Sequence, residues 1–335
     1  MRLLKYALTG VFVGLLWGAG AARSAEPVKI RLAWQTPIST WGSILLEKKD
    51  LAKHLGTSYA LEPVRYVGTP TMITALANSE LEVADLAFST IPIAIQNAGM
   101  DDLRIIADEF QDGVQGHYSN EFMVLVESPI KKIEDLKGKV VATNALGSGV
   151  EIAMRSTLKK HGLEDRRDYT IIETPFGTML PMLIGRKADL VTAVLPFAHD
   201  PELRKTARTL FEMKDELGIT QLGAWTARKS FLDRNRAAMV DFMEDTLRIV
   251  RWYLDPMNHK EVTEIGARVT KQPAERFAWV FTDKDNYRDW NMLPNLDALQ
   301  RNIDLVRDLG YVKGSIDIKK FADLSIVKEA AERLK

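Results

Sequence analysis

The chain alternates short apolar runs with helical patterns from Val28 to about Leu217, and this order constrains its fold more than any other feature. The runs VKIRLAW, YALEPVRYV, VADLAF and LRIIADEF each have the length and composition of a strand. Helical patterns follow the first three runs, as in WGSILLEKKDLAKHLG, PTMITALANSE and IPIAIQNAG. Strands that alternate with helices form a mostly parallel sheet with helices on its faces. The sequence therefore predicts an α/β fold.

Part of this pattern occurs twice. RYVGTPTMITALANSELEVADLAF and TIIETPFGTMLPMLIGRKADLVTA both contain a strand, a Thr-Pro pair, a Met-bearing helix and an Ala-Asp-Leu strand opening. The spacing from Pro70 to Asp85 nearly equals that from Pro175 to Asp189. We therefore predict two similar α/β lobes. After Arg228 strands become scarce, and helices such as RAAMVDFMEDTLRIVRWYLD predict a helical extension on one lobe.

The N-terminus differs from the rest of the chain. MRLLKY is basic, ALTGVFVGLLWGAG is apolar, and AARSAEP supplies small residues before a proline. This pattern is typical of a secretory signal peptide, here residues 1–25. An uncleaved anchor helix is the alternative, but the apolar run is short for a membrane span of about 20 residues. No cysteine follows the run, so a lipid anchor is not expected, and we predict a periplasmic protein.

Composition excludes several classes of function. Lys and Arg number 45, as do Asp and Glu, so no basic surplus favours nucleic acid. Without cysteine the chain has no disulfide, thiolate metal site or cysteine nucleophile. Its five histidines lack metal-ligand spacing, and no G-x-S-x-G elbow is present. We therefore expect no catalytic residue, metal ion or cofactor.

Several predicted strands end in a polar or small residue with a proline close behind. These junctions are WQTPIST, VGTP, FSTIP, TPFGTMLP and VLPFAHDP. Ser and Thr cap helix N-termini, and proline fits the first helical turn. The junctions therefore bring helix starts to the carboxyl edge of the sheet, where open α/β folds bind ligands. Each helix start stabilises an anion by roughly 0.3–1 kcal/mol.

Aromatic residues near the junctions predict a ligand cleft with apolar walls. They are Trp34, Trp41, Phe88, Phe176, Phe197 and Trp225.

The stretch NALGSGVE follows the strand KVVAT and looks like a phosphate-binding glycine loop. It lacks the third glycine of a dinucleotide fingerprint, because that position is Ile152, and no Gly-Lys-Ser/Thr follows. Ser148 and Glu151 instead predict a capping box that starts a helix. Any ligand contact from this loop must come from the first N–H groups of that helix or from the Asn144 side chain.

The chain resembles the periplasmic substrate-binding proteins of ABC importers. The likeness lies in VKIRLAWQTP, ALANSELEVADLAFSTIP, SPIKKIEDLKGKVVATNALGSGVEIAMRSTLKKHGL, MLIGRKADLVTAVLPF and LGYVKGSIDIKKFADLSIVKEA. It points to the nitrate/sulfonate/taurine group, which is related to the thiamine-pyrimidine synthases. The resemblance implies a type II periplasmic binding protein fold with ligand held between two lobes. Lobe 1 would comprise residues 26–115 and 223–335, with the helical C-terminal extension, and lobe 2 residues 116–222.

The same resemblance implies a non-enzymatic monomer that closes on its ligand and delivers it to an ABC permease with a cytoplasmic ATPase. Carried over position by position, the ligand contacts would be Gln35, Trp41, Gly68, Thr69, Ser89, Thr90, Asn144, Leu146, Gly147, Ser148, Phe176, Gly177, Thr178 and Leu195. No arginine at these junctions could clamp a sulfonate bidentately. We therefore expect a small organic anion, of sulfonate or aromatic carboxylate type, held by N–H groups and hydroxyls.

Two other functions fit the same residues. One is a sensory protein that presents its ligand to a membrane receptor. The other is an enzyme of the pyrimidine-synthase branch, which resembles a cytosolic protein with a cysteine-rich motif. A cysteine-free chain with an export signal fits that branch poorly.

Overall fold

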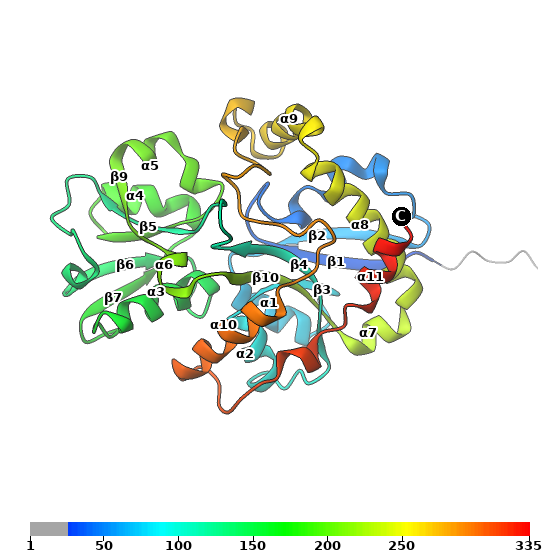
Figure 1. The fold of residues 1–335 in the computed structure, drawn as a ribbon, viewed down its shortest axis with the longest axis horizontal. Helices are drawn as coiled ribbons and strands as arrows, with labels where there is room; N and C mark the ends of the chain where they lie inside the picture. The colour runs from blue at the N-terminus through cyan, green and yellow to red at the C-terminus, as the bar shows by residue number, and fades with distance from the viewer. Residues whose placement is uncertain (1–25) are drawn as a thin grey trace, which may run out of the picture.

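The computed structural model describes residues 26–335 and has two lobes, each built on a five-stranded sheet (Figure 1). The predicted signal peptide lies outside the described residues. The sheet of the first lobe contains β1 (Val28–Trp34), β2 (Tyr59–Arg65), β3 (Val83–Ala87), β4 (Leu103–Asp112) and β10 (Thr220–Arg228). Its strand order is β2-β1-β3-β10-β4. β10 runs antiparallel to both of its neighbours, whereas β1 pairs in parallel with β2 and β3.

The second lobe repeats this arrangement. Its sheet contains β5 (Glu121–Leu125), β6 (Lys139–Thr143), β7 (Tyr169–Glu173), β8 (Leu190–Ala193) and β9 (Ala207–Glu212). The order is β7-β6-β8-β5-β9, and here β5 is the antiparallel strand. The predicted α/β class with two mostly parallel lobes is therefore confirmed.

The predicted strands of the first lobe are the observed β1 to β4. β2 contains Pro63, and it lies at the edge of the sheet, where a strand tolerates a missing N–H group. β3 is buried along its whole length, as an apolar central strand should be. The chain leaves this sheet after β4 and returns to it at Thr220. The predicted return point, Gly223, therefore lies inside β10.

Short helices connect the strands. They are α1 (Thr69–Ala77) and α2 (Thr90–Gln96) in the first lobe, and α3 (Gly149–Lys160), α4 (Met179–Ile184), α5 (Pro201–Thr206) and α6 (Met213–Leu217) in the second. The helix predicted over 41–56 is instead two 3₁₀ segments, η1 (Trp41–Ser43) and η2 (Leu45–Leu51). Buried carboxylates explain the difference. Asp245 accepts the N–H groups of Lys53 and His54 and so replaces their helical acceptors, while Glu109 accepts the N–H of Trp41 at the start of the segment.

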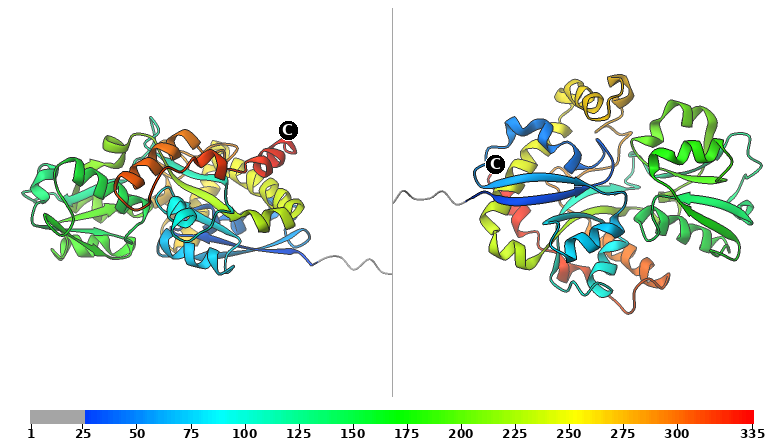
Figure 2. Two further views of the ribbon diagram at one scale, coloured as in Figure 1. Left: turned by 90° about the horizontal axis from the view of Figure 1, so that it is seen from below. Right: turned by 180° about the vertical axis from the view of Figure 1, so that it is seen from behind.

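The C-terminal helices cover the first lobe. They are α7 (Lys229–Arg234), α8 (Arg236–Leu254), α9 (His259–Thr270), α10 (Leu296–Asp308) and α11 (Ser325–Glu332). α8 packs on β2 and η2, and α11 packs on α8 and β4. Figure 2 shows these helices gathered on the first lobe, with α10 beside the second. The predicted helical extension is therefore confirmed. Within residues 26–335, no helix combines the length and apolar character needed to cross a membrane.

The internal repeat differs from its sequence alignment in one respect. In the second lobe, Asp189 precedes β8 and accepts the N–H of Val140 at 2.9 Å. The residue with this role in the first lobe is Glu82, which accepts the N–H of Arg31 at 2.8 Å. Asp85, which the repeated Ala-Asp-Leu aligns with Asp189, lies in the middle of β3 instead. The structural equivalent of Asp189 is therefore Glu82, three residues before the Asp85 that the sequence alignment suggests. The burial of Asp85 in β3 must have a different cause.

Candidate functional site

A cavity lies between the two lobes, and residues of both lobes line it. Its first-lobe wall contains Gln35, Thr36, Ser39, Thr40, Thr69, Asp85, Ala87, Phe110, Leu222, Gly223 and Asn286. Its second-lobe wall contains Asn120, Asn144, Ser148, Gly149, Val150, Phe176, Val194 and Leu195. Phenylalanines from both lobes and a few amide and hydroxyl groups therefore face the same space.

The cavity brings together part of the predicted ligand-binding set. Gln35, Thr69, Asn144, Ser148, Phe176 and Leu195 line it. Trp41, Gly68, Ser89, Thr90, Leu146, Gly147, Gly177 and Thr178 do not. Trp41 is buried behind the wall, where its ring stacks on Phe281, and Leu146 points outward. Thr90 is the first residue of α2, and its hydroxyl donates to the carbonyl of Ala87.

Two of the predicted residues, Ser89 and Asn144, also join the lobes. The Ser89 hydroxyl donates across the cleft to the carbonyl oxygen of Gly147 at 2.8 Å. The Asn144 side chain donates to the carbonyl oxygen of Val67 at 3.2 Å. These bonds hold the two lobes together beside the cavity. Residues at the strand–helix junctions therefore join the lobes as well as line the cavity.

A further ion pair joins the lobes elsewhere. Arg276, in the C-terminal part of the first lobe, lies 2.7 Å from Asp200 at the start of α5. His199 contacts the carbonyl oxygen of Lys284 at 3.2 Å in the same region. The lobes therefore contact each other at two separate places, and the arrangement is closed.

The start of α3 is held by its own side chains. Ser148 accepts the N–H of Glu151, as the predicted capping box requires, but the Glu151 carboxylate accepts the N–H of Gly147. The Ser148 hydroxyl donates to Asn144 Oδ1 at 2.9 Å. The N–H groups of the first helical turn have no acceptor within the helix. Since Gly149 and Val150 line the cavity, their N–H groups are the donors of this loop that a ligand can reach.

Sequence reasoning missed most of the first-lobe wall. Phe110 and Leu222 come from strands β4 and β10, and Asn286 comes from the loop DKDNYRD, so none follows a strand–helix junction. Asp85 had a visible signal, because it is a charged residue inside the apolar run VADLAF. A buried charge in a central strand is rare without a partner or a function.

Asp85 has a buried acidic neighbour, Glu109. Burial raises the pKa of Asp85 to about 7, and a 3.3 Å bond from Gln35 opposes the rise. Burial, and next the charge of Asp85, raise the pKa of Glu109 well above its usual range. Glu109 accepts the backbone N–H of Trp41 at 2.6 Å and the indole N–H of Trp225. Glu109 is therefore fully engaged by the protein, and Asp85 is not.

Arg288 is the buried cation near the cavity, and the protein itself binds it. Its guanidinium donates to the carbonyl oxygens of Ser39 and Asn286 and pairs with Asp285 at 3.0 Å. It also lies over the ring of Phe281. Arg288 does not line the cavity, so it fixes the loops that do.

The family model of the NMT1-like family matches residues 23–267. The chain belongs to the NMT1-like family. No curated protein shows a match.

Solved structures of periplasmic binding proteins share the fold of this NMT1-like protein, so the predicted two-lobed fold is confirmed. One is the alkanesulfonate-binding protein SsuA from Xanthomonas axonopodis pv. citri bound to MOPS (TM-score 0.70, 16% identity, 90% of this chain and 99% of that chain covered). Another is the nitrate-binding protein NrtA from Synechocystis PCC 6803 (TM-score 0.69, 14% identity, coverage 92% and 90%). The desulfurization enzyme DSZB has a similar fold (TM-score 0.67, 13% identity, coverage 92% and 100%). At such identities the likeness shows the fold alone.

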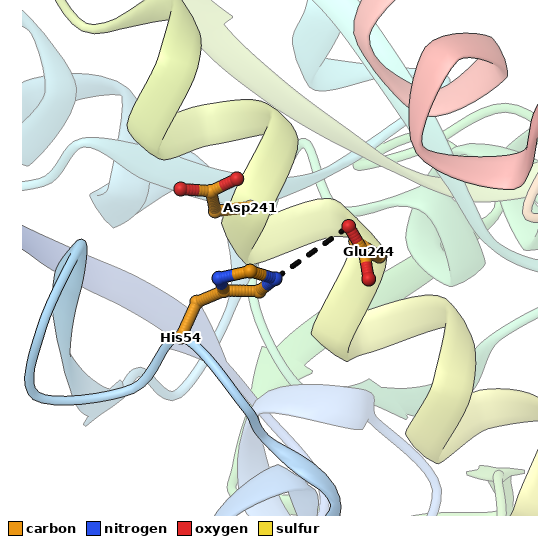
Figure 3. A group of neighbouring side chains, drawn as sticks. All are labelled: His54, Asp241 and Glu244. Atoms are coloured by element: carbon orange, nitrogen blue, oxygen red, sulfur yellow. Dashed lines mark ion pairs between the residues drawn. The ribbon is translucent and has the colours of Figure 1, made fainter. Parts of the chain in front are cut away.

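A second cluster of ionisable groups lies outside the cavity (Figure 3). His54, Asp241 and Glu244 approach closely enough to share an ion, and they are the one such group in residues 26–335. Both carboxylates already have cationic partners, because Glu244 lies 2.6 Å from Arg248 and Asp241 lies 2.9 Å from Arg333. We therefore assign the cluster to the attachment of α8, with no metal.

The buried acids of this NMT1-like protein predict how its stability depends on pH. Burial raises the pKa values of Asp85, Asp108 and Asp112 from 3.8 to about 7. The folded protein therefore holds protons that the unfolded chain releases above about pH 4, and its free energy of unfolding falls as pH rises from about 4 to 7. A bond to Glu134 raises the pKa of His161 and acts in the same direction, whereas burial lowers the pKa of His199 and opposes it.

We expect the ligand-free protein to melt at least about 5 °C higher at pH 5 than at pH 8. Calorimetric scans at both pH values measure the difference. The Asp108→Asn variant is the control, because it removes one titrating group and should reduce the difference. A melting temperature that rises with pH would contradict the prediction.

Proposed function

We propose that this protein is an extracytoplasmic solute-binding protein that captures a small organic molecule between its lobes and delivers it to an ABC import permease. The observation that supports this most is a set of buried polar atoms without partners in the cavity wall. Among the described residues these are Ser39 Oγ, Thr69 Oγ1, Asp85 Oδ1 and Asn286 Nδ2. Buried polar groups are nearly always hydrogen-bonded, so a ligand that satisfies them gains affinity and orientation.

The donors of the cavity favour an acidic group on the ligand, of sulfonate or carboxylate type. The N–H groups at the start of α3 and the amide of Asn286 can donate to it. The rings of Phe110 and Phe176, with Leu222, would cover an apolar frame. Proteins of the same fold that bind an alkanesulfonate and nitrate are consistent with an anionic ligand.

The lining supports binding without catalysis. Among the described residues, Asp85 is the only ionisable side chain in the wall, and it bonds to Gln35 and not to a hydroxyl that could act as a nucleophile. The fold cannot decide this point, because a desulfurization enzyme shares it. We propose a periplasmic monomer whose closed form is read by the permease. A sensory protein would use the same cavity, and an adjacent gene for a receptor instead of a permease would favour that alternative.

Ligand titration tests the proposed function. The chain from residue 26 onward is purified, unfolded to release any retained ligand, refolded, and titrated with organic sulfonates and aromatic carboxylates. We expect at least one compound to change tryptophan emission and to raise the melting temperature. Ligand at 100 times its Kd adds about 2.7 kcal/mol to the free energy of unfolding. If no compound binds, and none is retained from the producing cell, solute binding is wrong.

A further inference from the structure

The cavity wall contains an acidic side chain but no basic one among the described residues. The acidic side chain is that of Asp85, and the wall has no Lys, Arg or His within residues 26–335. Asp85 is 1% exposed, so the carboxylate is almost fully removed from water. Isolated buried charges are strongly unfavourable, and proteins normally pair them. The wall therefore carries an uncompensated acid where the predicted anion alone would add a second negative charge.

One oxygen of Asp85 is available to a ligand. Oδ2 accepts the 3.3 Å bond from Gln35, while Oδ1 is buried without any partner in the described chain. Gly223, on the neighbouring strand β10, keeps the approach to this oxygen open. A Cβ atom at Gly223 would lie 2.9 Å from Asp85 Oδ1 and 3.3 Å from Glu109 Cβ. Any other residue at this position would fill the space beside the free oxygen.

The N–H groups that reach Glu109, and the guanidinium of Arg288, are already engaged elsewhere. The backbone N–H of Trp41 and the indole N–H of Trp225 both donate to Glu109. The guanidinium of Arg288 is bound by two carbonyl oxygens and Asp285. Asp85 lines the cavity and no hydrogen bond of the described residues reaches its Oδ1, so a molecule in the cavity can supply the missing donor.

We propose that the ligand carries a basic nitrogen, as an ammonium or another protonated N–H group, which binds Asp85 Oδ1 and supplies the positive charge that the wall lacks. This inference rests on the proposed solute binding and narrows its ligand class. Combined with the donors at Asn286 and the start of α3, it describes a zwitterion. The nitrogen would lie against Asp85 of the first lobe, and the acidic group would face the start of α3 in the opposite wall, with Asn286 as a further donor from the first lobe. Asp85 is then the residue that separates such compounds from simple acids.

Matched trios of compounds test the proposal. One trio is 4-(aminomethyl)benzoate, 4-(hydroxymethyl)benzoate and 4-ethylbenzoate, and another is 3-aminopropanesulfonate, 3-hydroxypropanesulfonate and butanesulfonate. Compounds retained by the protein from the producing cell are identified by mass spectrometry in parallel. We expect the amine of a binding trio to bind roughly 10- to 100-fold more tightly than its partners, since bonds between charged groups are strong. A retained compound should likewise contain a basic nitrogen.

The Asp85→Asn variant separates ligand recognition from structure. It keeps the shape of the side chain but removes the charge, so we expect amine affinity to fall roughly 10- to 100-fold. At pH 8, above the raised pKa of Asp85, the same variant should unfold at a higher temperature than wild type without ligand, because the unpaired charge is gone. A purely structural role for Asp85 would give the opposite change. Asp108→Asn is the matched control, since Asp108 is equally buried, bonds to Gln221 and lies outside the cavity wall.

Each outcome bears on one of the two claims. If acids without nitrogen bind as tightly as their amines and Asp85→Asn binds like wild type, the inference is wrong while solute binding stands. Tight binding of the hydroxyl compounds alone would also overturn it, because a neutral donor would then suffice. If nothing binds or is retained, the proposed function fails and the inference fails with it.

Discussion

Gly149→Val is expected to weaken ligand binding roughly 10- to 100-fold while both lobes stay folded. Gly149 begins α3 in the second lobe, where it meets the first lobe across the cleft. A Cβ atom there would lie 2.9 Å from Leu222 Cδ1 and 3.1 Å from Ala87 Cβ. The larger valine side chain therefore prevents the lobes from reaching the closed arrangement. Isothermal titration calorimetry with a ligand of the wild type measures the loss, and small-angle X-ray scattering measures the opening.

Two comparisons separate closure from other effects of this substitution. Gly177→Ala adds a Cβ that meets only Phe197 of its own lobe, at 3.4 Å, so closure should be unaffected. Leu222→Ala removes the atom nearest to the new side chain. In the Leu222→Ala background, Gly149→Val should therefore cost less affinity than in wild type. Wild-type affinity in the Gly149→Val protein would show that the lobes do not need this contact.

The same contact explains what the sequence could and could not reveal about NALGSGVE. The stretch lacks the third glycine of a dinucleotide fingerprint and the lysine of a phosphate loop, which excluded nucleotide binding. Ser148 correctly predicted a helix start. The role of Gly149 depends on the first lobe, whose Leu222 is 73 residues further along the chain. Gly68 has the reciprocal position, with a hypothetical Cβ 3.0 Å from Ala145 Cβ. Local patterns report local structure, so contacts made only when two lobes meet were invisible.

The cavity wall shows the same limit. Periodicity placed the strands, and the family resemblance identified Gln35, Thr69 and Phe176, which lie at strand–helix junctions, as wall residues. Residues that enter the wall from the middle of a strand follow no such motif. Asp85 was read as a strand opening because its tripeptide matched that of Asp189, and only the hydrogen bonds of the two lobes revealed the shift.

Asp245→Ala is expected to lower the free energy of unfolding by about 3–5 kcal/mol, which is the largest stability effect that we predict. Asp245 lies on α8 and is fully buried. It accepts four hydrogen bonds, from the backbone N–H groups of Lys53 and His54, the Tyr59 hydroxyl and the Arg248 guanidinium. Its removal leaves these donors without their acceptor at the point where α8 joins the first sheet. Urea denaturation, followed by circular dichroism, measures the loss.

A nearby carboxylate provides the control. Asp241 lies about one turn earlier on α8, but its pair with Arg333 is partly exposed. Exposed pairs contribute about 0–1 kcal/mol, so Asp241→Ala should cost far less than Asp245→Ala. Asp245→Asn keeps the shape and one acceptor oxygen, and we expect an intermediate loss. If the two alanine variants are equally stable, Asp245 does not anchor α8.

Ligand affinity distinguishes Asp245→Ala from Gly149→Val. Asp245 contacts neither the cavity nor the opposite lobe, so the folded fraction of Asp245→Ala should bind with wild-type affinity at a temperature well below its melting point. Gly149→Val should show the reverse, with normal stability and weak binding. If Asp245→Ala loses only stability and Gly149→Val loses only affinity, the stability of the first lobe does not depend on closure of the two lobes. If each variant loses both stability and ligand affinity, closure itself stabilises the fold.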